Sequence, residues 1–122
     1  MAKQSVITFE KRELPTAADP VRIEELKIGD TYFKVSYVDD DMTIPLVDSV
    51  VFIGLNLDGD EEDTLYFQDV ESYRSGIRIS DTDVEPEDAT FYATQASTLL
   101  AMFDFEGALE ELMRCSIRRK SS

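Results

Sequence analysis

The chain of 122 residues carries 26 acidic and 12 basic side chains, so its formal net charge is −14, and this balance argues against binding to nucleic acids or anionic membranes. It has no histidine and one cysteine, which excludes Ser-His-Asp and Cys-His catalysis, nearly every zinc site and an intramolecular disulfide. The length and the apolar fraction of 43% suit one domain, residues 1–122, and no run approaches the ~20 apolar residues of a membrane span.

The N-terminal part of the sequence has weak structural signals. It lacks the continuous apolar stretch of a signal peptide, so, with the lone cysteine, we expect a soluble protein of the cytoplasm. "SVITFE", residues 5–10, predicts a short strand. Residues 14–26 contain two prolines and predict a loop.

Apolar and polar side chains alternate from Thr31 to Val38, which predicts a strand. Gly29 and Asp30 predict a turn directly before it. The ten residues "LKIGDTYFKV" resemble the opening turn and first strand of small SH3-like barrels. The resemblance implies a small barrel as one form of the fold.

Five further segments are candidates for the rest of a sheet. In "MTIPLVDS", Pro45 restricts the segment to an edge, a bulge or a crossing. "VVFIGLNL", residues 50–57, predicts a central strand, and Gly54 within it indicates a bulge. "TLYFQDV", "SGIRIS" (75–80) and "TFYAT" predict three more strands.

The C-terminal segment changes to a helical period from Asp104, a suitable N-cap, with early acids and late bases that suit the helix dipole. The face expected on the sheet holds Phe105, Ala108, Leu109, Leu112, Met113 and Ser116, and the outer face holds Glu106, Glu110, Glu111 and Arg114. Cys115 is expected to be a core residue rather than a reactive thiol. The preceding "STLLAMF" suits a helical turn or a strand.

These elements predict an α+β fold. It has five or six strands in a strongly bent antiparallel sheet or a small open, SH3-like barrel, with one C-terminal amphipathic helix.

The acidic stretch "GLNLDGDEEDTLYFQD", residues 54–69, suggests either a calcium loop or a hairpin. An EF-hand frame starting at Asp58 puts Asp63 where glycine is needed, and its flanks read as strands instead of helices. Asp58-Gly59 is a standard turn dipeptide, so the sequence predicts a hairpin.

An up-and-down meander from residue 31 onward would bring two acidic loops to one end of the sheet. Such an end suits a basic partner or weak binding of a divalent cation, whereas two separate solvated loops would serve solubility alone. The candidate binding residues are Asp58, Asp60, Glu61, Glu62, Asp63, Asp81, Asp83, Glu85, Glu87 and Asp88.

The expected function is that of a non-enzymatic acidic module that binds a protein partner with a basic surface, for example as an immunity protein or inhibitor. The alternative is a small ligand-binding protein or enzyme that uses carboxylates with Mg²⁺ or Ca²⁺. No glycine-rich phosphate loop, Walker motif or Cys-x-x-Cys pair is present, so no cofactor is expected. A homo-oligomer is compatible with the sequence.

Overall fold

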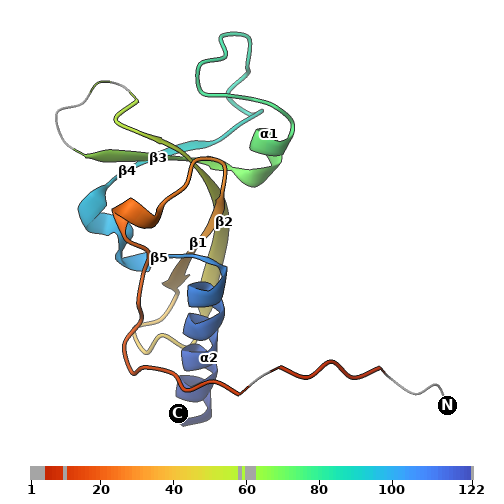
Figure 1. Cartoon of the computed structure of the whole chain (residues 1–122), viewed down its shortest axis with the longest axis vertical. Coiled ribbons are helices and arrows are strands. Elements are labelled where there is room, and N and C mark those ends of the chain that lie inside the picture. Colours follow the sequence, from red (N-terminus) through yellow and green to blue (C-terminus); the bar gives the residue numbers. More distant parts are fainter. Residues whose placement is uncertain (1–4, 10, 58, 60–62, 122) are drawn as a thin grey trace.

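The computed structural model describes residues 5–9, 11–57, 59 and 63–121, and it shows an α+β fold (Figure 1). Five antiparallel strands form one sheet in the order β4-β3-β2-β1-β5. They are β1 (Thr31–Tyr37), β2 (Pro45–Leu55), β3 (Thr64–Asp69), β4 (Phe91–Gln95) and β5 (Met102–Phe103). The helices are α1 (Val70–Arg74) and α2 (Phe105–Ser121), with short 3₁₀ turns η1 (Ile23–Glu25) and η2 (Ala96–Ala101). The sheet is not closed, and an SH3-like barrel is not confirmed.

β2 is a single strand of eleven residues where the sequence predicted two segments. Pro45 is its first residue, a position at which the missing N–H interrupts no ladder. The register of β2 and β3 shifts between Phe52 and Gly54, which confirms the bulge that Gly54 indicated.

The prediction of a strand at residues 75–80 is wrong. The chain forms α1 directly after β3, and residues 75–80 belong to no strand. The Asp69 carboxylate accepts the Ser72 N–H at 3.0 Å and so caps this helical turn. Gly76 follows the turn with a φ of 96°, which favours glycine. Thr90 then returns to Asp69, whose carboxylate accepts the Thr90 N–H at 2.8 Å. The connection from β3 to β4 therefore contains no strand.

The N-terminal part also differs from its prediction in one place. Residues 5–9 pair with no strand in the described part of the chain, and Figure 1 shows them leading away from the body of the molecule. Residues 14–26 are mostly loop, as predicted, with η1 near their end. Residues 97–103 combine both expected forms, since η2 leads directly into β5.

Two apolar clusters fix the elements on opposite faces of the sheet. One lies under η1 and η2 and contains Val21, Tyr32, Val50, Phe52, Leu65, Phe67, Leu99 and Met102. The other lies under α2 and contains Val35, Phe103 and Ala108, with Phe33 and Tyr37 packed against them. The alternation along β1, with Tyr32 on one face and Phe33 on the other, is what a strand covered on both faces requires.

α2 begins as predicted, because the Asp104 carboxylate accepts the Gly107 N–H at 2.7 Å. Its buried face differs from the prediction and consists of Ala108, Glu111, Arg114 and Cys115. Arg114 was expected in water, but its Nε donates to the Pro15 carbonyl at 2.9 Å, so the N-terminal segment covers this side of the helix. The burial of Cys115 confirms its core position.

None of the helices within the described ranges has the length and apolar character that a membrane crossing requires.

Candidate functional site

The open edge of β2 is the feature that distinguishes this sheet. Residues 45–49 pair with β1 on one side, but the pairing of β2 with β3 begins only at Val50. In the described part of the chain, no strand continues β3 beside these five residues, which we call the open edge. Its side chains Leu46 and Val47 are 52% and 44% exposed. An unpaired strand edge with apolar side chains is a template for another strand.

The backbone of the open edge is oriented for such pairing. Val38 N–H donates to the Ile44 carbonyl at 2.9 Å, and Phe52 N–H donates to the Asp30 carbonyl at 3.1 Å. Residues with even numbers along β2 therefore bond to the β1 side, because bonding alternates along an antiparallel strand. Val47 consequently directs its N–H and C=O away from β1.

An apolar groove of about 190 Å³ borders the open edge on the α2 face of the sheet. We call it the α2 groove; its lining residues are Phe33, Val47, Phe105, Ala108, Leu109 and Leu112. The Phe105 ring packs edge-on against Phe33 at 5.8 Å between centroids, yet Phe105 is 68% exposed. Part of the face predicted to dock on the sheet thus lines an open groove.

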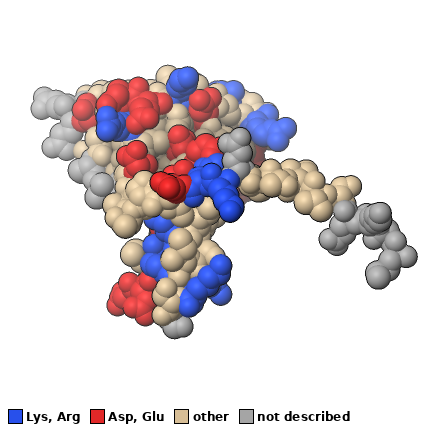
Figure 2. Space-filling view, turned by 60° about the horizontal axis from the view of Figure 1, so that its bottom comes forward, with Lys and Arg blue, Asp and Glu red and all other residues tan. Residues whose placement is uncertain are grey.

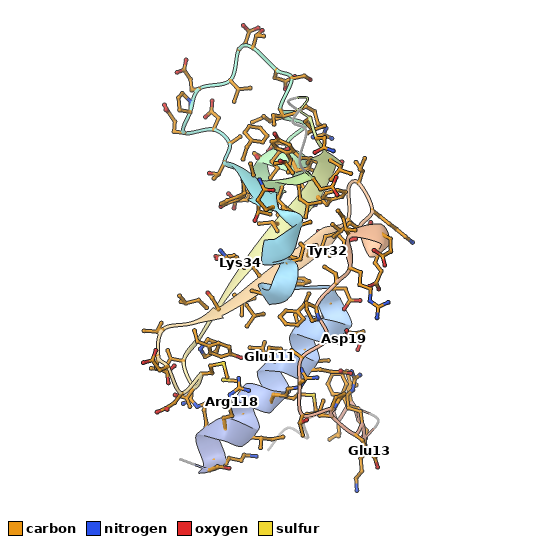
Figure 3. The ribbon with its side chains drawn as sticks, turned by 90° about the vertical axis from the view of Figure 1, so that its left-hand side faces the viewer. Glu13, Asp19, Tyr32, Lys34, Glu111 and Arg118 are labelled. Atoms are coloured by element: carbon orange, nitrogen blue, oxygen red, sulfur yellow. The ribbon has the colours of Figure 1, made fainter. Side chains whose placement is uncertain are left out.

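A second groove, of about 230 Å³, borders the open edge on the opposite face, next to η2. We call it the η2 groove. Its floor is apolar, with Val50 and Phe67, and its charged members are Lys34 and Asp48, which are paired across β1 and β2. Figure 3 shows Lys34 beside η2. A strand added to the open edge would meet a groove on each face.

A partly buried polar cluster holds the β1–β2 hairpin against α2. The Tyr37 hydroxyl donates to the Glu111 carboxylate, and Arg118 Nη2 lies 2.6 Å from the Tyr37 oxygen and 3.1 Å from Glu111 Oε2. Arg118 Nε also donates to the Met42 carbonyl at 2.8 Å, which ties α2 to the hairpin tip. Burial, together with the hydrogen bond to Glu111, raises the pKa of Tyr37 well above its ordinary value. Figure 3 shows Glu111 and Arg118 along α2.

The hairpin tip is fixed by Asp39. Its carboxylate accepts the Thr43 hydroxyl at 2.6 Å and the N–H groups of Thr43 and Ile44 at 2.9–3.1 Å. These hydrogen bonds, that of the Thr43 hydroxyl first, lower the pKa of Asp39, so it stays charged. With Asp40 and Asp41 beside it, the tip places three acidic residues next to the open edge.

The structure describes six of the ten acidic residues predicted as a binding surface, namely Asp63 and the five at 81–88. Asp63 adjoins the start of β3, where its carbonyl accepts the Ala96 N–H at 3.3 Å. The residues at 81–88 follow the end of β3, in the connection that returns to β4 at Phe91. They are Asp81, Asp83, Glu85, Glu87 and Asp88, whereas Asp58, Asp60, Glu61 and Glu62 lie outside the described residues.

The two strands that flank the stretch at 54–69 are antiparallel neighbours, as a hairpin requires, while Asp58 of the predicted turn lies outside the described residues. Asn56 closes it: its N–H donates to the Thr64 carbonyl at 2.8 Å, and its side chain accepts the Thr64 N–H at 2.9 Å. Among the described residues, no group of three or more Asp, Glu, His or Cys is placed to hold a metal ion.

Sequence reasoning missed the open edge and both grooves. The available signal was the run "IPLVDSVVFIGL", which is longer than either strand expected to pair with it. If Pro45 had been read as the first residue of one long strand, β2 would have exceeded its neighbour β3 by five residues.

Charge is unevenly distributed around this region. Figure 2 shows basic side chains along the narrow part of the molecule that holds the C-terminal half of α2, with a group of acidic side chains at its side. The basic residues here include Arg118, Arg119 and Lys120 in the last turn of α2. Comparisons with protein-family models, with curated proteins and with solved structures found no match for this chain.

Proposed function

We propose that the protein is a non-enzymatic, cytoplasmic acidic module that binds an extended segment of another protein as an added strand on its open edge. The observation that carries this proposal is the five-residue edge at 45–49, unpaired on one side and bordered by a groove on each face. In this mode of recognition, main-chain hydrogen bonds supply affinity and grooves for alternate side chains supply specificity.

The lining of the two grooves supports a binding role. All residues of the α2 groove are apolar, which suits an aliphatic or aromatic side chain of the partner. The η2 groove offers Lys34 and Asp48 at its margin, which suits a polar or charged side chain.

The charge of the molecule favours a basic partner. Asp39, Asp40 and Asp41 lie at the hairpin tip and Asp48 lies within the edge, and the whole chain carries −14. The basic side chains nearby are Lys34, opposite Asp48, and Arg118 and Arg119, which donate to carbonyls of the tip. Negative potential of this kind accelerates the approach of a cationic partner and disfavours an acidic one. An inhibitor that neutralises a basic protein is one concrete form of this function. The loop at 81–88 would then serve as a further acidic contact.

A displayed library of random short peptides, selected on the purified full-length protein, tests the proposal. We expect enrichment of β-branched or aromatic segments flanked by Lys or Arg, with binding that weakens as salt rises. Val47→Pro removes the outward N–H while keeping an apolar side chain, and should abolish binding of the selected peptides. Val47→Thr keeps that N–H and should retain most of it.

Two results would overturn the proposal. One is the absence of any enrichment over an unrelated acidic protein. The other is equal binding of the selected peptides to a folded Val47→Pro variant and to the unchanged protein, since this would place the peptides elsewhere.

A further inference from the structure

The N-terminal arm, residues 5–9, exposes an unusual amount of apolar surface. Val6, Ile7 and Phe9 are 84%, 89% and 79% exposed. No described hydrogen bond or ion pair involves the arm, and Figure 1 shows it leading away from the body. Three large apolar side chains within four residues are costly to leave in water.

The arm starts from a fixed point on the outside of α2. Arg12 Nη1 lies 2.9 Å from Glu106 Oε2 and 3.1 Å from Glu110 Oε2. Successive residues of an α-helix are about 100° apart around its axis, so these two acids face away from the α2 groove that Phe105 and Leu109 line. The helix therefore lies between the root of the arm and the open edge of the same chain.

We propose that the arm of one copy adds as a strand to the open edge of a second copy, and that two copies exchange arms in a symmetric dimer. The inference rests on the proposed function of the open edge, and it identifies the arm of a second copy as one segment that binds there. It also explains why the sequence of residues 5–9 favours a strand although these residues pair with no strand among the described residues of one chain.

The residue pattern of the arm fits an edge with a groove on each face. Ile7 and Phe9 are two residues apart and share one side of an extended strand, while Val6 and Thr8 share the other. The first pair suits the wholly apolar α2 groove. The second pair, smaller and partly polar, suits the η2 groove with its charged margin.

The arm itself carries no charge, but the residues that flank it are mostly basic. Of these, Arg12 is already paired with Glu106 and Glu110. Residues 1–12 contain three basic residues and one acidic residue, in a chain whose net charge is −14. Asp48 lies within the open edge, opposite Lys34 on β1, and the three aspartates of the hairpin tip come shortly before the edge in the sequence. The basic residues that flank the arm are therefore attracted to a second copy of net negative charge, whereas the bodies of two copies repel one another.

Arm exchange has a consequence for partner binding. A bound arm would hide the open edge and remove an aggregation-prone strand edge from solution. A partner segment must then compete with the arm, so binding of the partner should release monomers.

Sedimentation equilibrium of the full-length protein is the central test. We expect a concentration-dependent dimer, weakened at least about tenfold by Ile7→Asp, because the dimer would bury the new charge in an apolar groove. Ile28→Asp is the matched control: it changes the same residue type at another exposed position (69%) and should leave the dimer unchanged. Val47→Pro should weaken the dimer, and Val47→Thr should not.

Ile7 is 89% exposed in the single chain, so Ile7→Asp should leave folding unchanged. A weaker dimer would then be due to the lost contact between chains. A protein that stays monomeric at all concentrations, or equal dimerisation of Ile7→Asp and Ile28→Asp, would overturn the inference. A synthetic peptide with the arm sequence separates the two proposals. If library peptides bind the open edge and the arm peptide does not, the proposed dimer is wrong, but the proposed binding function is retained. If neither kind of peptide binds, both proposals are wrong.

An isotope-filtered NOE spectrum of a mixed labelled and unlabelled sample checks the exchange directly. Contacts from the Ile7 methyl groups to Val47 or Leu109 should appear between chains. The same contacts found only within one chain would show that the arm folds back on its own edge, and would overturn the exchange.

Discussion

Glu111 illustrates how a single charged residue can stabilise the fold from inside. Its carboxylate accepts hydrogen bonds from Tyr37 and Arg118 and lies 3.3 Å from Arg114 Nη1. Glu111→Gln should lower the free energy of unfolding by about 1.5–3 kcal/mol, because buried hydrogen bonds to a charged group are lost and two guanidinium groups lose their counter-ion. Urea unfolding measures this loss.

Glu110 is the matched control for that substitution. Its side chain is 30% exposed and its ion pairs with Arg12 and Arg114 are near the surface, so Glu110→Gln should cost less than about 1 kcal/mol. Equal losses at the two positions would show that the buried cluster contributes nothing special.

The raised pKa of Tyr37 implies that the free energy of unfolding depends on pH in the alkaline range. Its pKa is raised in the folded state by burial and by Glu111, so the native state holds the phenolic proton more tightly than the unfolded chain, in which the pKa is about 10. This contribution is complete below pH ~10 and is lost as pH rises above it. The stability difference between the unchanged protein and Tyr37→Phe should therefore shrink between pH 9 and 11 in urea titrations. A constant difference across this range would contradict the shift.

At the scale of elements, α2 shows what helical periodicity can and cannot predict. The N-cap at Asp104 and the long helix follow from local sequence, because capping and dipole effects act within one turn. The burial of Arg114 depends on Pro15, which lies far away in the sequence, and periodicity carries no such information. The same holds for residues 75–80, whose β propensity is overridden by the helical turn that Asp69 caps.

The open α2 groove changes the expected cost of truncating the helix. Leu109 is half-buried and lines that groove, so Leu109→Ala should cost about 1 kcal/mol in a denaturant titration. Leu65 is fully buried in the cluster under η1 and η2, and Leu65→Ala should cost about 2–5 kcal/mol. If Leu109→Ala were as costly as Leu65→Ala, the groove would be closed in solution.

Cys115 provides a test of the same helix by chemistry. Cys115 is 2% exposed, so a thiol reagent should label it slowly in native buffer and quickly in denaturant. Rapid and stoichiometric labelling of the folded protein would mean that α2 leaves the sheet readily.

At the scale of the whole molecule, strand parity decides where the acidic loops lie. The sequence supplies the charges but not the number of strands between them, and the loss of one expected strand puts Asp63 and residues 81–88 at opposite ends of β3. The open edge could not be predicted from the sequence either, because it depends on where β3 ends relative to β2. The hydrophobic periodicity of the segments predicted the fold class, whereas the site depends on relative strand lengths.

The net charge of −14 predicts a stability that depends on salt. Like charges spread over a small domain repel one another, and the screening length falls from about 30 Å at 0.01 M salt to about 10 Å at 0.1 M. The melting temperature should therefore rise over this range.

Asp83→Lys, in an exposed loop, makes the net charge less negative by two, from −14 to −12. It should raise the melting temperature at low salt with little effect at high salt. Lys11→Arg preserves the charge at another exposed position and should change neither. A melting temperature independent of salt, or an Asp83→Lys effect of the same size at both salt concentrations, would show that local contacts and not overall repulsion set the electrostatic contribution.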